Sequence, residues 1–229
     1  MNAADKDPRP PGAARNVSPP LGPQDLIEIA TRTIGHYDAK AEHFWEQTRD
    51  HDVTQNRNCL LRHIESDPPF TILDLGCGGG RDLSAFRTLG HTAIGLDGSA
   101  QLCAIARRVS QCEVLQQDFL ALSLPGATFD GVFANASLFH VPTQELARVL
   151  GELREAIKPR GVLFCSNPRG ENVEGWQQNR YAALHDYERW CRLLGTAGFT
   201  ELEHYYRPAD EPRHRQPWLA SAWRRDDGR

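Results

Sequence analysis

The chain has 229 residues, of which 40% are hydrophobic and 24% are charged. That length supports one domain with its own hydrophobic core plus appendages, and it leaves little room for two full domains. With 26 Lys and Arg residues against 30 Asp and Glu residues, the formal net charge of −4 disfavours a protein that coats nucleic acid. No window reaches the roughly 20 consecutive apolar residues of a membrane span, and the N-terminus has no apolar stretch to serve as a signal peptide. We therefore expect a cytoplasmic protein with no membrane partner.

The six cysteines have neither the spacing of zinc ligands nor a context for disulfides. They never form a C-x-x-C pair, and none stands at zinc-finger or zinc-ribbon spacing from a histidine. Without a secretion signal, a disulfide framework is equally disfavoured. We expect most of them to be small buried apolar residues, and we predict no metal site.

The N-terminal part divides into a proline-rich tail and a helical segment. Residues 1–22 have almost no large apolar side chains, so burial cannot offset the entropy lost on ordering, and we predict a disordered tail there. From residue 24 onwards, apolar residues recur at helical spacing, and further helical patterns run from about 38 to 49 and from 53 to 64. We expect one domain over residues 23–229, with a helical lid over 23–66 and a core over 70–229.

Strand and helix patterns alternate through most of the predicted core. The expected strands are 71–75, 91–97, 113–116, 128–134 and 162–165, and the expected helices between them are 82–90, 99–109 and one that Pro142 opens and Pro159 stops. This alternation predicts βαβ units and a parallel sheet. After a helix at about 185–195, two strand patterns at 199–206 and 217–224 follow each other without a crossover helix, so they must run antiparallel.

A glycine cluster joins the first predicted strand to its helix. Residues 74–82 read DLGCGGGRD, and glycines in such a loop let backbone N–H groups and the helix N-terminus approach a ligand closely. Asp97 ends the second predicted strand, from which a carboxylate can accept both ribose hydroxyls. In the dinucleotide fingerprint G-x-G-x-x-G, the third glycine would stand at Arg81, and this departure disfavours NAD or FAD. The pattern predicts a site for a nucleoside ligand.

The ordered motifs of residues 70–166 resemble those of the class I S-adenosylmethionine-dependent methyltransferases. Asp74, Gly76, Gly78 and Gly80 match the first motif of that family, D-x-G-x-G-x-G, and Asp97 matches the second. Residues 117–119 (QDF), 129–135 (FDGVFAN) and 153–163 (LREAIKPRGVL) are similar to later motifs. The resemblance implies a Rossmann-like, doubly wound α/β fold with a seven-stranded sheet, mostly parallel with an antiparallel C-terminal strand, and an N-terminal helical lid.

The resemblance also implies S-adenosylmethionine as the cofactor and names the residues that would bind it. They are Asp74, Gly76, Cys77, Gly78, Gly80, Asp97, Gly98, Ser99, Asp118, Phe119 and Asn135, together with Trp45 and Arg49 of the lid. Arg49 would pair with the methionine carboxylate. Methyl transfer neutralises the sulfonium charge, so the protein has mainly to align donor and acceptor, and no metal is required.

Candidate catalytic and substrate-binding residues come from the lid and from loops after the fourth and fifth strands. The resemblance implies that Tyr37 directs its hydroxyl at the sulfonium methyl, and either His51 or His140 could take a proton from the acceptor. Arg169 and Tyr181 are candidate substrate contacts at either end of the polar loop 171–180. The alternatives are that His140 only packs, that residues 49–52 form a solvated charge cluster, and that Arg169 belongs to a surface turn.

These residues predict a methyltransferase that moves a methyl group to a small-molecule N, O or S nucleophile by in-line transfer. The alternative is a tRNA or protein methyltransferase of the same fold. An NAD-dependent oxidoreductase and a non-catalytic cofactor-binding scaffold are more remote alternatives. We expect a monomer or homodimer whose partner is a small-molecule acceptor, with nucleic acid disfavoured.

Overall fold

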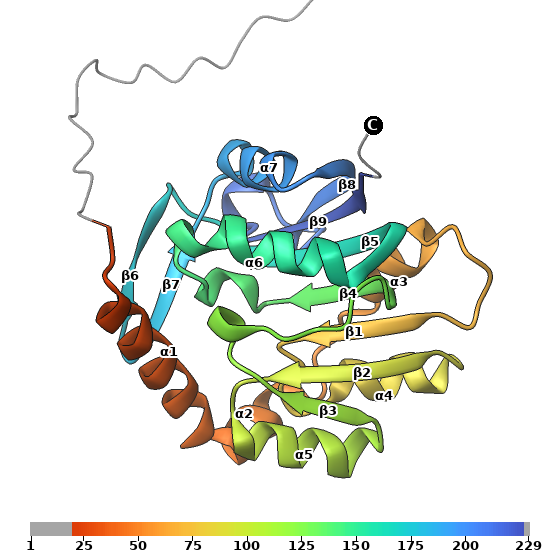
Figure 1. The fold of residues 1–229 in the computed structure, drawn as a ribbon, viewed down its shortest axis with the longest axis horizontal. Helices are drawn as coiled ribbons and strands as arrows, with labels where there is room; N and C mark the ends of the chain where they lie inside the picture. The colour runs from red at the N-terminus through yellow and green to blue at the C-terminus, as the bar shows by residue number, and fades with distance from the viewer. Residues whose placement is uncertain (1–19, 227–229) are drawn as a thin grey trace, which may run out of the picture.

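A seven-stranded sheet runs through the computed structural model, which describes residues 20–226 (Figure 1). The strand order is β3-β2-β1-β4-β5-β9-β8. The strands are β1 Thr71–Leu75, β2 Thr92–Asp97, β3 Glu113–Gln116, β4 Phe129–Asn135, β5 Ile157–Pro168, β8 Phe199–Arg207 and β9 Trp218–Arg225. Strands β1 to β5 pair in parallel, whereas β9 lies between β5 and β8 and is antiparallel to both. The Rossmann-like, mostly parallel sheet with an antiparallel C-terminal strand is therefore confirmed.

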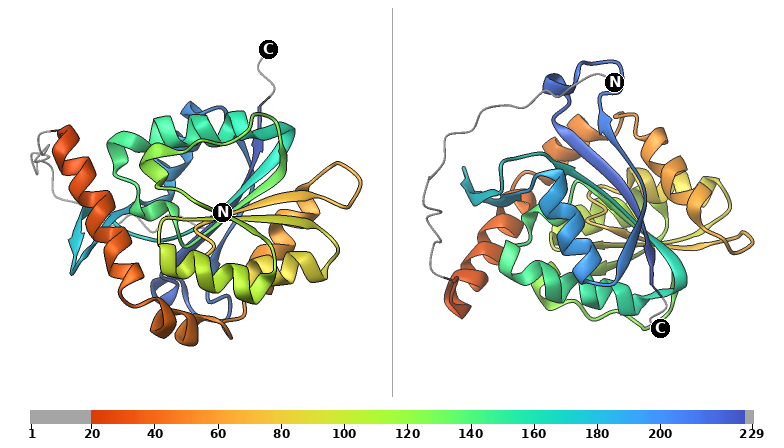
Figure 2. Two further views of the ribbon diagram at one scale, coloured as in Figure 1. Left: turned by 60° about the horizontal axis from the view of Figure 1, so that its bottom comes forward. Right: turned by 90° about the horizontal axis from the view of Figure 1, so that it is seen from above.

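Helices cover both faces of the twisted sheet (Figure 2). One face carries α3 (Thr54–His63), α4 (Arg81–Thr88) and α5 (Ala100–Ser110), and the other carries α6 (Thr143–Ala156) and α7 (Tyr187–Thr196). Helix α6 shows why they dock, because Leu146, Val149, Leu150 and Leu153 recur on one side of the helix and are all fully buried. The apolar sides of the helices and the two faces of the sheet thus form two core layers.

The first two helices lie at the carboxyl ends of the parallel strands instead of on a face. Helix α1 (Pro23–Asp38) crosses the edge toward which the arrowheads of β1, β2 and β4 point, and α2 (Ala41–Thr48) continues from it (Figure 1). Helix α3 does not lie where a single lid over residues 23–66 would place it. Its Cys59 and Leu60 are completely buried in the core beneath the sheet, so of these three helices α1 and α2 cover the edge and α3 covers a face.

The polar segment expected as a loop over 171–180 instead forms most of a β-hairpin. Strands β6 (Val173–Gln177) and β7 (Arg180–Leu184) pair antiparallel around Gln178 and Asn179, and Gln178 takes a left-handed φ of 58°. Side-chain and backbone contacts hold this hairpin to α1 and α6. The Tyr181 N–H donates to the Thr33 hydroxyl (3.1 Å), the Arg32 guanidinium lies 3.9 Å above the Trp176 ring, and the backbone N–H of Thr143 donates to Glu174 (2.8 Å). The hairpin thereby joins α1 to the start of α6.

The disordered tail expected over residues 1–22 falls outside the described residues as far as position 19. The end of that segment is held, because the backbone N–H and C=O of Leu21 both hydrogen-bond to the Gln144 side chain (2.8 and 3.0 Å). Within residues 20–226, no helix is long and apolar enough to cross a membrane.

Candidate active site

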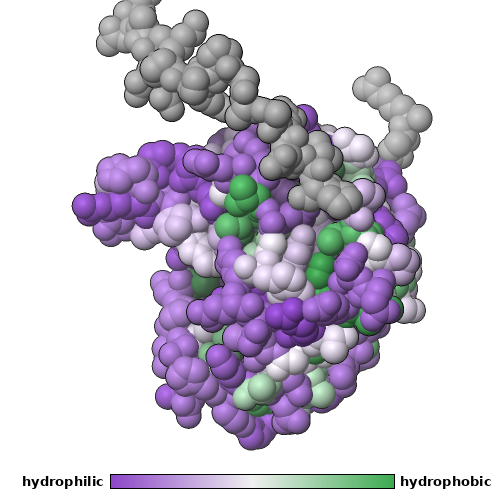
Figure 3. Space-filling view, turned by 90° about the vertical axis from the view of Figure 1, so that its left-hand side faces the viewer, coloured by the Kyte–Doolittle hydropathy of each residue, from purple (hydrophilic) through white to green (hydrophobic). Residues whose placement is uncertain are grey.

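A pocket opens at the carboxyl ends of β1, β2 and β4, beneath α1. The strand order reverses between β1 and β4, and open α/β sheets bind ligands outside such a switch point. The pocket holds about 730 Å³ of empty space, part of it at the open mouth. Seen from this edge, the surface is mostly polar with a few apolar patches (Figure 3).

The pocket wall includes nine of the residues predicted as site residues, and α1 supplies its roof. The nine are Tyr37, Gly76, Gly78, Asp97, Gly98, Ser99, Asp118, Phe119 and His140. The roof consists of Ile29, Ala30, Thr33 and Ile34, which sequence reasoning treated only as one face of a helix.

The glycine loop between β1 and α4 is a turn in which side chains do not fit. Gly76, Gly78 and Gly80 have φ angles of 77°, 52° and 87°, a region that disfavours residues with a Cβ. A Cβ on Gly76 would lie 2.4 Å from the Ser137 Cβ, and one on Gly79 would lie 2.3 Å from the Trp45 ring. Predicted Trp45 therefore packs on this loop, while Gly80 and the buried Cys77 shape it from outside the pocket wall.

Asp97 places a buried carboxylate at the end of β2. Its Oδ2 accepts the Gly78 N–H (3.0 Å), and its Oδ1 accepts the Ser99 N–H (2.9 Å). Burial raises the pKa of Asp97, while these backbone hydrogen bonds act in the opposite direction. Each carboxylate oxygen can accept a further hydrogen bond, which fits the two hydroxyls of a ribose.

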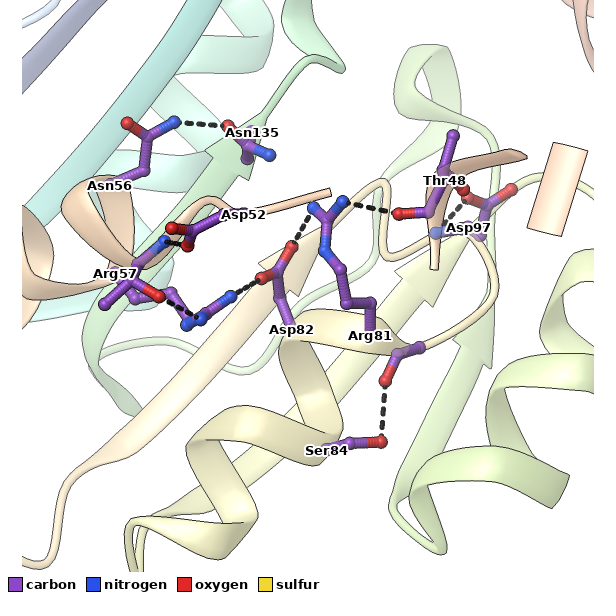
Figure 4. A network of polar contacts seen from close by, with 12 residues as sticks. Thr48, Asp52, Asn56, Arg57, Arg81, Asp82, Ser84, Asp97 and Asn135 are labelled. Atoms are coloured by element: carbon purple, nitrogen blue, oxygen red, sulfur yellow. Dashed lines mark hydrogen bonds and ion pairs between the residues drawn. The ribbon is translucent and has the colours of Figure 1, made fainter. Parts of the chain in front are cut away.

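A network of charged groups connects the glycine loop to α2 and α3 (Figure 4). Asp82 accepts hydrogen bonds from Arg57 (2.6 Å) and Arg81 (2.5 Å), and Arg81 also donates to the carbonyl of Thr48 at the end of α2 (3.0 Å). Beneath the loop, burial and the neighbouring Asp82 raise the pKa of Asp74 well above its usual range. Arg81, which departs from the dinucleotide fingerprint, thus fastens the end of α2 to the loop.

Asn135, at the end of β4, is held by a side chain that the sequence did not reveal. Asn56 of α3 is 1% exposed, and its Nδ2 donates to the Asn135 Oδ1 (2.8 Å; Figure 4). The Asn56 oxygen in turn accepts from the Tyr205 hydroxyl (2.8 Å) and from Arg207 (3.1 Å). No periodic pattern pointed to Asn56, because its partners lie 79 to 151 positions away in the sequence.

The Tyr37 hydroxyl and the His140 ring meet in the pocket wall. Tyr37 Oη lies 2.8 Å from His140 Nε2, and His140 Nδ1 lies 2.6 Å from the carbonyl oxygen of Tyr181. Because a carbonyl oxygen can only accept, Nδ1 carries the proton and Nε2 accepts from Tyr37. Arg180 also donates to the Tyr37 hydroxyl (3.1 Å). Burial, assisted by the Arg180 charge, lowers the pKa of His140 to about 4.

Three other predicted site residues are not brought to this pocket. Arg49 follows the last turn of α2, where its side chain is 53% exposed and pairs with Asp50, and the neighbouring His51 is exposed. Arg169 follows β5 and donates to the carbonyls of Arg213 and Gln216 in the loop before β9. Arg49 and His51 therefore lie on the exposed segment after α2, and Arg169 is held against the loop before β9.

Tyr181 contributes through its backbone instead of its phenol. Its side chain is buried with its ring edge against Trp176, while its N–H and C=O bond to Thr33 and His140. It therefore links α1 to the catalytic candidate His140.

One group of potential metal ligands lies together within residues 20–226, on the α3 side of the sheet. The ligand atoms of Cys59, His63 and Glu203 all lie within 4.8 Å of one another. Arg62 already pairs with Glu203 through both carboxylate oxygens, and burial raises the pKa of the Cys59 thiol to about 11. The cluster is thus a charge-matched contact between α3 and β8, and the absence of a metal site stays a prediction.

Comparison with known proteins places these features in a family. Residues 72–161 match the family described as methyltransferase domain. A trans-aconitate 2-methyltransferase from Azoarcus sp. (strain BH72) is 35% identical over 113 residues, which cover 48% of this chain and 44% of that protein. A ubiquinone biosynthesis O-methyltransferase from Nitrosococcus oceani is 27% identical over 201 residues, covering 74% of this chain and 83% of that protein. The chain therefore spans less than half of the first relative and most of the second.

Among solved structures, the fold is similar to 1,6-didemethyltoxoflavin-N1-methyltransferase from Burkholderia thailandensis, determined with bound 1,6-didemethyltoxoflavin and S-adenosylhomocysteine. The TM-score is 0.74 at 21% identity, and the match covers 92% of this chain and 94% of that one. The family match spans the glycine loop, Asp97 and the fourth strand, around which the pocket is built. The match to a methyltransferase domain and the similar methyltransferases support a class I S-adenosylmethionine-dependent methyltransferase, and that family implies S-adenosylmethionine as the cofactor.

Proposed function

We propose that this protein transfers the methyl group of S-adenosylmethionine to a small-molecule N, O or S nucleophile. The observation that carries the proposal is the Tyr37–His140 pair, which shares one pocket with Asp97 and the glycine loop. Bound in this pocket, the cofactor would supply an activated methyl group on a sulfonium. The pair would then stand at the reacting end of the cofactor.

Each part of the pocket suits one part of the cofactor. The carboxylate of Asp97 would accept the ribose hydroxyls, and Asp118 and Phe119 would lie against the adenine. The turn at Gly76, which a Cβ would fill, lets the backbone approach the methionine chain. Residues of α1 close the roof and exclude water, which favours the alignment of donor and acceptor.

His140 offers one base atom for the acceptor proton. Because Nδ1 is engaged with the Tyr181 carbonyl, only Nε2 can receive a proton, and since Nε2 accepts from Tyr37, the proton would pass through the Tyr37 hydroxyl. With a pKa of about 4, His140 is neutral at pH 7 and is therefore ready to accept. An acceptor that loses its proton as the new bond forms would suit such a weak base.

The net charge and the relatives support a small acceptor in preference to tRNA or protein. The α1 roof covers the pocket, the formal charge is −4, and the similar proteins include methyltransferases named for trans-aconitate and 1,6-didemethyltoxoflavin. All six cysteines are free, which fits a reducing compartment such as the cytoplasm.

A labelled-methyl screen tests the proposal. The full chain would be incubated with methyl-labelled S-adenosylmethionine and a metabolite extract, and label should reach the low-molecular-weight fraction. His140→Ala should lower turnover by about 10²- to 10⁴-fold while leaving S-adenosylhomocysteine affinity nearly unchanged. Label found only in tRNA or protein would contradict the small-molecule acceptor but not the cofactor. An unchanged turnover per folded His140→Ala molecule would mean that this ring only packs.

A further inference from the structure

We propose that Arg180 binds a carboxylate of the methyl acceptor, so that the site selects anionic small molecules. This inference rests on the proposed function and adds the substrate class to it. Arg180 is a cation of the β6–β7 hairpin that lies next to the Tyr37–His140 pair and has no acidic partner among residues 20–226.

Arg180 is an uncompensated charge beside the Tyr37–His140 pair. Its Nη1 donates to the Tyr37 hydroxyl (3.1 Å), and it takes part in none of the ion pairs between residues 20 and 226. Its charge acts on His36, Tyr37 and His140, none of which is an anion at pH 7. Asp97, an acid that also acts on Tyr37, accepts the backbone N–H groups of Gly78 and Ser99. The nearby acid of the same hairpin, Glu174, is engaged with the first N–H of α6.

The unused side of the guanidinium has the geometry that carboxylates prefer. Since Nη1 faces Tyr37, the Nε and Nη2 N–H groups form the remaining fork, and Nε is buried without a hydrogen-bond partner. A buried donor of this kind is costly unless something pairs with it. A carboxylate can accept from both arms of such a fork at once, which a neutral group cannot match.

The position of Arg180 points to the acceptor instead of the cofactor. Tyr37 and His140 line the pocket that also contains Asp97 and Gly76, whereas Arg180 does not line it. It reaches the Tyr37 hydroxyl from the hairpin, none of whose residues lines the pocket wall. An anion on Arg180 would therefore hold the acceptor against the base and the phenol.

Binding measurements on the full chain test the proposal without requiring a known acceptor. Wild type, Arg180→Met, Arg180→Lys and the control Arg108→Met would be saturated with S-adenosylhomocysteine and titrated with trans-aconitate, malonate and benzoate. Each acid would be compared with its neutral methyl ester. Arg108 is a suitable control because it is an exposed arginine of α5 whose partner is Glu42 (3.4 Å).

We expect wild type and Arg108→Met to bind at least one acid about tenfold or more tightly than Arg180→Met does. Arg180→Lys should recover part of the loss, because it keeps the charge but not the fork. The esters should not distinguish the variants. A wild-type complex that binds none of the acids better than Arg180→Met overturns the assignment.

A second arm separates the acceptor from the cofactor's own carboxylate. S-adenosylhomocysteine has that carboxylate, and 5′-methylthioadenosine lacks it, so both would be titrated into wild type and Arg180→Met. Equal affinities in the two proteins support the acceptor subsite. Selective weakening of S-adenosylhomocysteine in the variant overturns it in favour of the cofactor. Failure of wild type to bind S-adenosylhomocysteine at all would overturn the proposed function as well, so the two failures are distinguishable.

Discussion

Asp97 is a single residue on which we expect the cofactor site to depend, because its carboxylate organises the Gly78 and Ser99 backbone and remains able to accept two more hydrogen bonds. We expect S-adenosylhomocysteine at a hundred times its dissociation constant to stabilise wild type by roughly 2.7 kcal/mol, and NAD to have no effect. Asp97→Ala should lose most of this gain, and thermal melts with and without ligand would measure it. Because the variant also frees two backbone donors, each protein must be compared with its own ligand-free melt. An undiminished ligand shift in the variant would show that Asp97 does not bind the ribose.

His140 should also be visible in the pH dependence of stability. Burial lowers its folded-state pKa from the ordinary 6.5 to about 4, so between these values the unfolded chain binds a proton that the folded one does not. Stability from this group is therefore fully present above pH 6.5 and is lost as the pH falls toward 4, by about 3 kcal/mol in all.

A comparison of urea denaturation at pH 7 and pH 4.5 for wild type and His140→Gln measures that effect. Wild type should lose more stability than the variant over this interval, since glutamine does not titrate. His185, whose pKa burial also lowers to about 4, contributes equally to both proteins and cancels in the difference. Parallel pH profiles for the two proteins would mean that His140 is not held neutral by the fold.

At the scale of elements, the β6–β7 hairpin depends on α1 for its position. The Thr33 hydroxyl accepts the Tyr181 N–H, and both residues are buried. Thr33→Val would leave that N–H unpaired at similar side-chain volume, which should lower the free energy of unfolding by about 1–3 kcal/mol.

Thr31→Val is the matched control, because Thr31 lies on the same helix but is exposed. It should change the unfolding free energy by less than about 0.5 kcal/mol. Urea denaturation of both variants measures the contrast. Equal effects would show that the contact between α1 and the hairpin does not stabilise the fold.

At the scale of the whole molecule, activity should survive removal of metal ions. Methyl transfer from a sulfonium neutralises charge, so it needs no Lewis acid, and Glu203 of the Cys59–His63–Glu203 cluster is already matched by Arg62. Turnover should be the same after treatment with EDTA as before. A loss that zinc restores in wild type, but not in His63→Ala, would instead make this cluster a functional metal site.

Local sequence was sufficient for most of the elements and for many of the residues that line the pocket. Hydrophobic periodicity is a property of neighbouring residues, so the alternating strands and helices and the antiparallel C-terminal pair followed from it. The glycine turn could likewise be predicted, since residues at positive φ with close neighbours select glycine. Asp97 was found because its distance from that turn is set by one βαβ unit.

The hairpin and the true extent of the lid were not predictable in this way. Strand β6 is mostly exposed and polar, so it has no apolar alternation. Its contact with α1 is that of Trp176 with Arg32, while Thr33 of α1 binds the neighbouring strand β7 through Tyr181. Helix α3 shows ordinary helical spacing, which cannot specify whether a helix covers a sheet face or an edge. The core contacts of Leu60 settle that point.

Sequence by itself therefore determined the fold class and predicted the family and the cofactor, whereas tertiary structure decided which polar side chains meet beside the pocket. Tyr37 and His140 are 103 positions apart, and Tyr37 and Arg180 are 143 apart. Arg49, His51 and Arg169 looked equally suitable in the sequence, yet they lie elsewhere, because a charged residue after an element carries no pattern that states its direction. Only the packing of α1 against the hairpin brings Arg180 to the Tyr37 hydroxyl and so next to His140, the proposed base.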